Sequence, residues 1–427
     1  MRGSPMVSID GSRQLSLHVH GILLAAALCA VPARQGCAQE VKVSATSGIE
    51  EIIVTAQRRE ESIQRTPIAV TALSGADLDA RTTFDLADVG EYVPNLDFST
   101  ATQSSRSSFV SSVFIRGIGQ TDFIVTTDPA VGIYVDGVYY GRTTGGVVDM
   151  LDIGRVEVLR GPQGTLFGKN TIGGALNVVS SPVGNEFGGT TEVTAGNYGR
   201  VGFRGDLNVP FSETFAGRIA VSVKRSDGYG KRLDFATGEE TSELGADDSE
   251  SARARLRWLI GENVEANLSV DYTRVREPQV PDDMKNIIPD APLLGLWNGL
   301  VGFPTGNPYL PIYLTNDDYT SYANGPNKAE LDLWGPGLTI EWRLGDYTIR
   351  SITAYRSMDA LFQNDGDGSP VRILGSDRVE LDQSQFSEEL HLLGTSFDDR
   401  LEWLAGLYYF DESADEDTAA YVLPGIF

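Results

Sequence analysis

The stretch that decides the fold of this 427-residue chain lies between residues 113 and 180. It contains VFIRGIGQ (113–120), GIYVDGVYYGR (132–142) and DIGRVEVLRGPQGTLFGKNTIGGALNVVS (152–180). Runs rich in β-branched residues predict short strands at 114–116, 133–136, 155–159 and 175–179, and glycine ends each run. Short strands that glycine turns separate indicate a compact, loop-rich sheet domain.

Together the three motifs resemble the plug domain of TonB-dependent outer-membrane receptors, and the third is long enough to be specific. The resemblance covers most of the chain after residue 38. It implies a mostly β protein, in which a small α/β plug precedes an antiparallel transmembrane β-barrel. The residues that match the plug motifs are Arg116, Gly117, Gly119, Asp136, Gly137, Arg155, Glu157, Arg160, Gly161, Gly164, Gly173 and Gly174.

Composition limits the classes of function. The formal net charge is −25, and residues 1–38 contribute +2 through three arginines and one aspartate, so the remaining chain carries −27. Nucleic-acid binding depends on dense lysine and arginine, so this charge argues against it and fits a solvated acidic surface. After residue 38 the chain has no cysteine and one histidine, His391. Disulfides, Cys/His zinc sites and thiol catalysis are therefore excluded, and we expect no enzyme, no cofactor and no metal site.

Residues 1–38 have the pattern of a secretory signal peptide. Arg2 and Arg13 supply positive charge, and GILLAAALCAV (21–31) is an apolar core of 11 residues. Small residues at Gly36 and Ala38 fit cleavage after residue 38. The core is too short to span a bilayer as a helix. With the resemblance, this pattern predicts export to the outer membrane of a Gram-negative bacterium.

Residues 39–66 are polar and charged apart from the island EEIIVTAQ (50–57), and we expect them to form a periplasmic tether. An apolar run inside a flexible tether can pair with the sheet edge of another protein by strand addition. In the family this position carries the TonB box. The residues that resemble the box are Glu51, Ile52, Ile53, Val54, Thr55 and Ala56. The alternative is that residues 52–54 form only the first strand of the plug.

The plug is expected to occupy residues 67–182 and to start with a strand at 68–72. Ser74, with Asp77 three residues later, has the spacing of a helix N-cap. Thr83 precedes a second run with apolar residues at helical spacing, so we expect a second helix there.

Four charged residues of the plug motifs, Arg116, Arg155, Glu157 and Arg160, lie in or beside apolar strands. Burying such charges is costly unless they are paired. They could form salt bridges with the barrel wall or pair inside the plug, and the resemblance favours the wall.

The loop GPQGTLFGKNT (161–171) has a superficial likeness to a phosphate-binding loop. Gln163 stands where such a loop needs glycine, and Asn170 stands where it needs serine or threonine. We therefore expect no nucleotide site.

From residue 187 the apolar residues recur with a period of two, most clearly at 264–273, where five apolar and five polar residues alternate. Runs of about ten residues suit tilted membrane strands with an apolar lipid face and a polar lumen face. Short turns alternate with long loops at 228–249, 277–330 and 361–377. This pattern therefore predicts that residues 187–427 form the N-terminal part of a transmembrane β-barrel.

We expect about nine strands in this region, whereas receptors of the family have 22. A closed bacterial barrel has an even number of strands, and eight would leave no room for a plug. The final residues, AYVLPGIF (420–427), are not expected to form a closing strand. The chain is therefore expected to be the N-terminal part of a longer receptor.

The resemblance implies an energy-coupled receptor that takes up a scarce solute, with a ferric siderophore as first candidate. Cobalamin, haem and glycans are alternatives. The partners it implies are a TonB-type energy-coupling protein, outer-membrane lipid and a small-molecule substrate such as an iron chelate, with the receptor as a monomer. One rival is a non-transporting fragment or surface ligand-binding protein. A second rival is a soluble periplasmic enzyme, which the missing cysteine and histidine disfavour.

Overall fold

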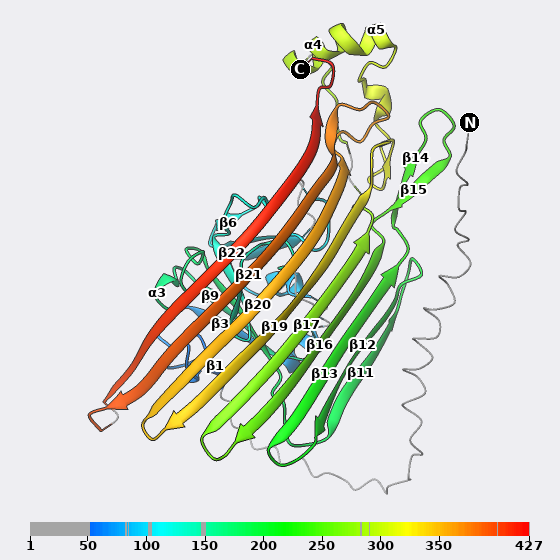
Figure 1. The fold of residues 1–427 in the computed structure, drawn as a ribbon. Helices are drawn as coiled ribbons and strands as arrows, with labels where there is room; N and C mark the ends of the chain where they lie inside the picture. The colour runs from blue at the N-terminus through cyan, green and yellow to red at the C-terminus, as the bar shows by residue number, and fades with distance from the viewer. Residues whose placement is uncertain are drawn as a thin grey trace, which may run out of the picture. The chain divides into compact units, whose positions relative to one another are not determined.

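The computed structural model describes residues 52–426, apart from 82, 84, 101–104, 147–150, 282–283, 290 and 399. The expected signal peptide, residues 39–51 of the expected tether and therefore Glu51 lie outside the described residues. Two sheets organise the described chain: a five-stranded sheet in a small domain, and a nine-stranded sheet that we call the wall (Figure 1). In the described part of the chain, no helix has the length and apolarity needed to cross a membrane.

The small domain contains the described residues from 52 to 180 and is built on a mixed sheet of order β3–β9–β10–β7–β8. Strand β10 is parallel to β7, and the other pairs are antiparallel. These strands are β3 (Val70–Ser74), β7 (Val131–Val135), β8 (Val138–Tyr140), β9 (Ile153–Arg160) and β10 (Gly174–Ser180). A second, antiparallel sheet contains β4 (Leu96–Thr100), β5 (Ser111–Ile115) and β6 (Ile118–Gln120).

Two of the sequence motifs are tight hairpin turns. Arg116 and Gly117 have φ of 54° and 77° and connect β5 to β6, while Asp136 and Gly137 have φ of 51° and 87° and connect β7 to β8. Two-residue turns with both φ values positive match the right-handed twist of the strands that they join. The strands expected at 114–116 and 133–136 therefore end one residue earlier than predicted.

The first expected helix begins where the sequence predicts. The Ser74 hydroxyl accepts a hydrogen bond from the Asp77 amide, and the Asp77 carboxylate accepts one from the Ser74 amide, both at 3.1 Å. This reciprocal capping box starts α2 (Gly75–Ala80).

The second expected helix is only a 3₁₀ helix, η2 (Ala87–Glu91). Its first amides, on Ala87 and Asp88, donate to the Asp85 carboxylate at 2.9 and 3.3 Å. Thr83, which precedes this run, does not cap it, because the nearer carboxylate of Asp85 accepts hydrogen bonds from the free amides.

The wall is an antiparallel sheet whose strands follow one another in chain order, and its nine strands confirm the expected number (Figure 1). Its strands are β11 (Gly188–Ala195), β12 (Val201–Pro210), β13 (Phe215–Ser226), β16 (Asp247–Ile260), β17 (Val264–Glu277), β19 (Lys328–Leu344), β20 (Tyr347–Asp365), β21 (Leu374–Ser396) and β22 (Leu401–Val422).

Strand length rises from 8 residues in β11 to 23 in β21, well beyond the expected ten. The long loop expected at 361–377 is wrong, since β20 and β21 continue into it and leave only residues 366–373 between them. In this part of β20 and β21 polar residues lie on both faces of the strands, so the apolar alternation that guided the prediction is missing. Strand β22 ends at Val422 and its partner in the wall is β21, so the described part of residues 420–427 forms no closing strand, as expected.

The outer face of the wall carries two aromatic rows. Trp334 contacts Tyr355 at 5.7 Å and Phe386 contacts Tyr409 at 6.2 Å, and Tyr355 pairs with Phe386 across β20 and β21. The second row lies eight residues from Tyr355 along β20, where Tyr347 contacts Trp403 with ring centroids 5.9 Å apart. The two rows are therefore about 27 Å apart along the strand.

A row of four aspartates lies beyond the first aromatic row. Asp332 pairs with Asp359, Asp359 with Asp382, and Asp382 with Asp415, so the four residues face one another across four neighbouring strands. The last three are exposed. Like charges directly opposite one another are destabilising, and the ion pair between Arg276 and Asp332 offsets part of that repulsion at one end of the row.

The connections at 228–246, 278–327 and 366–373 form a structure that we call the cap. It contains the small sheet β14 (Gly230–Leu233), β15 (Glu240–Leu244) and β18 (Thr320–Ser321), with α4 (Pro292–Trp297), the π-helical turn η3 (Asn298–Gly302), α5 (Phe303–Thr305) and η4 (Pro311–Tyr313). Trp297, Tyr309, Tyr313 and Val371 belong to its own apolar core. Two of the long loops expected from the sequence, at 228–249 and 277–330, are thus folded.

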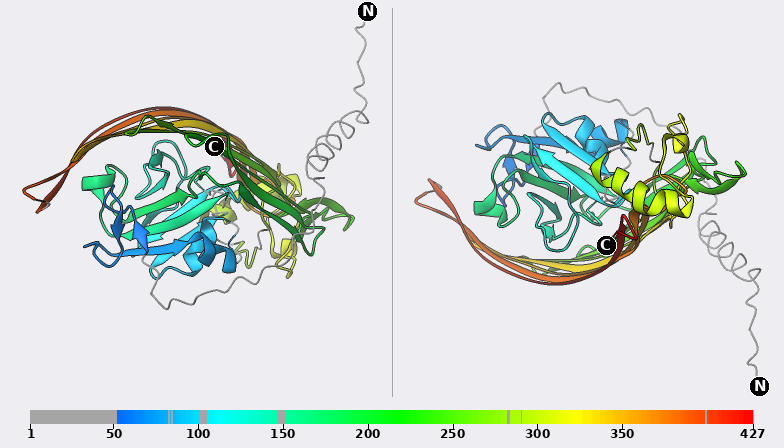
Figure 2. Two further views of the ribbon diagram at one scale, coloured as in Figure 1. Left: turned by 90° about the horizontal axis from the view of Figure 1, so that it is seen from below. Right: turned by 90° about the horizontal axis from the view of Figure 1, so that it is seen from above.

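The small domain lies against the concave side of the curved wall (Figure 2). Phe109 and Phe123 of the small domain contact Phe362 of β20, with ring centroids 5.2 and 5.0 Å apart. Leu331, Met358 and other apolar wall residues share this core. The inner face of the wall is therefore partly apolar, whereas the sequence predicted a polar lumen face.

Candidate functional site

The segment that resembles a TonB box is folded onto the small domain. Ile53 and Val54 form β1, which pairs with β2 (Glu61–Ser62) in a two-stranded ribbon. Val54 and Ala56 are fully buried, whereas Ile53 is 40% exposed. We call residues 52–66 the leading segment. The prediction of a flexible tether is wrong for this segment, because residues far away in the sequence supply the hydrogen-bond and packing partners that the segment by itself does not have.

Thr55 is the polar centre of that docking. Its amide donates to Glu157 Oε1 at 2.7 Å, and its hydroxyl donates to the same oxygen at 3.1 Å. Arg155 and Asn177 donate to the Thr55 hydroxyl at 3.2 and 3.1 Å. The Thr55 peptide and side chain are therefore enclosed by three polar residues of β9 and β10.

Arg58 connects the leading segment to the wall. Its φ is 61°, and its guanidinium lies 4.3 Å from the ring centroid of Phe167 and 3.4 Å from a carboxylate oxygen of Glu389 in β21. His391 lies 2.7 Å from that same oxygen, and Arg350 of β20 donates to the Arg58 carbonyl at 3.0 Å. His391 is thus a buried wall residue with a structural partner.

The contacts of the four plug-motif charges lie inside the small domain, and Arg155 and Glu157 pair with each other. Arg155 forms an ion pair with Glu157 at 2.7 Å, and Arg160 lies 3.5 Å from the Pro94 carbonyl. The Arg116 guanidinium lies beside Gly161. Among the described residues none of these charges pairs with the wall, so the preference for wall salt bridges is wrong. Arg155 and Glu157 lie two residues apart on β9 and therefore meet on the same face of that strand.

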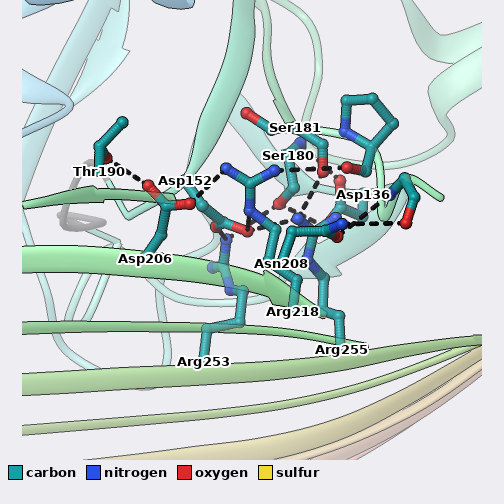
Figure 3. Close-up of polar contacts among 12 residues, drawn as sticks. Asp136, Asp152, Ser180, Ser181, Thr190, Asp206, Asn208, Arg218, Arg253 and Arg255 are labelled. Carbon is teal, nitrogen blue, oxygen red and sulfur yellow. Dashed lines mark hydrogen bonds and ion pairs between the residues drawn. The ribbon is translucent and has the colours of Figure 1, made fainter. Parts of the chain in front are cut away.

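The contacts that do join the small domain to the wall come from residues that the sequence did not single out. Asp152 lies just before β9 with a φ of 44°, and its side chain is 2% exposed (Figure 3). Arg255 forms a short ion pair with it, and Arg218 and Arg253 approach within 3.5 and 3.8 Å. Burial raises the pKa of the Asp152 carboxyl, and the guanidinium groups of Arg255 and Arg253 oppose that rise.

The wall arginines of this junction could have been found from strand periodicity. Arg253 and Arg255 are two residues apart on β16 and therefore share the inner face. A second junction involves Arg142, which forms a bidentate ion pair with Glu412 of β22 at 2.8 and 2.9 Å. These buried charges have partners only because the two sheets meet.

The glycine motifs serve the fold. An added Cβ at Gly174 would lie 2.2 Å from the Leu159 carbonyl oxygen, and one at Gly119 would lie 2.2 Å from the Val113 carbonyl oxygen. Gly164 begins the four-residue helix α3 (Gly164–Phe167). The remaining motif glycines, Gly161 and Gly173, lie where the chain enters α3 and β10.

The two side chains of residues 161–171 that depart from a phosphate-binding loop lie within the small domain. Asn170 donates to the Tyr139 hydroxyl at 2.8 Å, and Gln163 precedes α3. In the described ranges, no group of three or more His, Cys, Asp and Glu side chains is placed to hold a metal ion.

Two cavities flank these contacts. One of about 330 Å³ lies between the leading segment, β10 and the wall, and is lined by residues that include Thr55, Asn177 and Arg255. The other, of about 830 Å³, lies in the cap and is lined by residues that include Phe235 and Tyr322.

Comparison with known proteins identifies the small domain. Residues 62–175 match the family model of the TonB-dependent Receptor Plug Domain. The chain carries a TonB-dependent receptor plug. We call the small domain the plug. TonB-dependent receptors are outer-membrane proteins of Gram-negative bacteria, as the resemblance predicted.

Relatives and a solved structure agree with this assignment. A vitamin B12 transporter of Vibrio vulnificus is 30% identical over 164 residues, which cover 38% of this chain and 24% of that protein. The pesticin receptor of Yersinia pestis is 28% identical over 215 residues, 48% of this chain and 29% of that protein. The ferric yersiniabactin uptake receptor FyuA from Yersinia pestis has a similar structure, with a TM-score of 0.66, 19% identity and coverage of 83% of this chain and 50% of that chain. The matched region thus spans about a quarter of the curated relatives and half of the solved receptor.

Proposed function

We propose that this chain works in an energy-coupled outer-membrane receptor that takes up a scarce solute, with a ferric siderophore as first candidate. The observation that carries the proposal is a plug that rests against the concave face of a barrel-type wall, with a strand-forming segment docked at its start. Similarity to a ferric yersiniabactin uptake receptor supports the siderophore. Similarity to vitamin B12 transporters makes cobalamin the second candidate.

The proposed coupling partner is a TonB-type protein that binds residues 51–56 by strand addition. Ile53 and Val54 already have β conformation, and they pair only with the short strand β2. A two-stranded ribbon of this length is marginally stable by itself. A partner strand can therefore replace β2 once the segment leaves the plug.

The cap is the proposed region of first contact with the solute. Its cavity of about 830 Å³ has the size of a small-molecule site. Phe235 contacts Tyr313 and Tyr322 with ring centroids 4.9 and 5.1 Å apart, so the wall of the cavity is aromatic. An iron chelate would bring its own iron ligands, and the proposal includes no catalytic step.

The outer face of the wall is the proposed lipid contact of a monomeric receptor. The two aromatic rows are about 27 Å apart along a strand, which for a strand tilted by about 40° is roughly 20 Å of height, comparable to the apolar band between aromatic girdles. Exposed apolar residues such as Leu390 and Leu392 lie between the rows. Lipid would therefore cover this face.

Uptake in cells tests the proposal. Deleting residues 51–56 from the receptor should abolish uptake of a radiolabelled ferric siderophore or cobalamin, while surface binding of the same solute persists. Unchanged uptake would refute the role of the segment. Absence of binding for every siderophore and cobalamin in a broad panel would refute the proposed substrate classes.

A further inference from the structure

Glu157 is the most deeply buried charge that touches the leading segment. Its side chain has no exposed surface. Its Oε1 accepts from the Thr55 amide, the Thr55 hydroxyl and Arg155 Nε, and its Oε2 accepts from Asn177 at 3.1 Å. Two of these four donors belong to the leading segment, and the other two belong to the plug itself.

A buried carboxylate needs such donors, because removing it from water is costly unless hydrogen bonds replace hydration. Arg155 and Asn177 alone satisfy only part of this need. The Thr55 donors complete it, and hydrogen bonds to a charged group are stronger than neutral ones. The carboxylate therefore attracts the backbone of the leading segment at Thr55.

The neighbouring cavity makes this attraction reversible. About 330 Å³ of space is lined by Thr55 and Asn177, which are both partners of Glu157. This space is polar and large enough for water. When the leading segment departs, water can hydrate the carboxylate in place of the Thr55 donors, so undocking does not leave an unsatisfied buried charge.

We propose that Glu157 is the positioning residue that sets how firmly the leading segment is held on the plug. The inference deepens the proposed function, because the held segment is the one assigned to the coupling partner. Val54 and Ala56 add apolar packing and Arg58 pairs with Glu389 of the wall, whereas Glu157 supplies the charge-dependent contact between the leading segment and the plug. Its pairing with Arg155 keeps the carboxylate oriented toward Thr55.

The experiment uses a nitroxide label at Ile53→Cys in the full chain, with Cys29 and Cys37 replaced by serine. Ile53 is 40% exposed, so the label has room while its mobility reports docking. The two test variants are Glu157→Gln and Thr55→Val, which keep side-chain volume and remove the charge or the hydroxyl. Thr66→Val is the matched control, since the Thr66 hydroxyl donates only to the Ser62 carbonyl within the leading segment.

The ratio of mobile to immobilised label should rise about tenfold in each test variant, as expected for loss of one charge-assisted hydrogen bond. The Thr66→Val control should leave the ratio unchanged. An unchanged ratio in either test variant, or an equal rise in the control, overturns the inference. Binding of a purified TonB C-terminal domain is measured separately, so a tenfold rise without any binding would refute the proposed function and leave the role of Glu157 standing.

Discussion

Replacing Asp152 by asparagine tests how the plug is held against the wall. The carboxylate is 2% exposed and faces Arg218, Arg253 and Arg255. Removing one partner from a buried ion pair costs about 3–5 kcal/mol, because the remaining charge stays desolvated. Asparagine keeps the shape of the side chain and one hydrogen-bond acceptor, so we expect the lower end of this range, about 3 kcal/mol. That energy corresponds to a change of about 150-fold in an equilibrium constant.

The matched control is Asp79→Asn. Asp79 also joins the plug to the wall, through Arg204 at 3.4 Å, but its side chain is 74% exposed. Exposed ion pairs contribute about 0–1 kcal/mol, so this variant should change little. In both substitutions asparagine replaces an aspartate that pairs with arginine in the wall, and they differ in how deeply that aspartate is buried.

Hydrogen exchange measured by mass spectrometry provides the assay. Amides of β9 and β10 report opening of the plug, and amides of β16 and β17 provide an internal reference in the wall. Asp152→Asn should speed exchange in β9 and β10 by about 150-fold, and Asp79→Asn by less than about fivefold. Equal effects of the two variants would refute the argument that burial gives the junction its strength.

Two further predictions concern the cap and the plug core. Burial and the neighbouring Asp365 raise the pKa of Asp367 from 3.8 to about 6, so the stability linked to its proton is fully present below about pH 4 and is lost as pH rises through about 6. Amides of residues 366–373, corrected for intrinsic rates, should exchange more slowly at pH 5 than at pH 7.5, and Asp367→Asn should remove this difference. Gly174→Ala should destabilise the plug by at least about 2 kcal/mol in urea unfolding, because φ is 149° and the added Cβ would meet the Leu159 carbonyl. Gly164→Ala, where an added Cβ meets no atom within 4 Å, should be neutral.

Patterns among neighbouring residues in the sequence predicted the parts of the fold that depend on interactions between such neighbours. The dipeptides Arg116–Gly117 and Asp136–Gly137 form the turns that their glycines suggested, and Ser74 caps its helix. The nine wall strands followed from alternation of apolar and polar residues. Each of these features depends on residues within about ten positions of one another.

Features that depend on distant partners could not be predicted in the same way. The leading segment looked too polar to fold, but Thr55 meets Glu157 across 102 positions. The sequence does not single out Asp152, and only the approach of β16 shows why its charge is buried. Of the charges expected to meet the wall, Arg155 and Glu157 instead pair with each other on β9. Sequence periodicity shows on which face of a strand a side chain lies, but it does not show which other element will pack over that face.

The row of Asp332, Asp359, Asp382 and Asp415 has a consequence for where solute is met. Three of the four carboxylates are exposed and Asp332 pairs with Arg276, so the row marks the place where the outer face of the wall becomes polar. Strand β21 begins at Leu374, eight residues before Asp382, and thus extends about 27 Å past the row. Under the proposed function, these long strands hold the cap clear of the lipid-facing band, and the cap cavity would meet the solute outside the membrane.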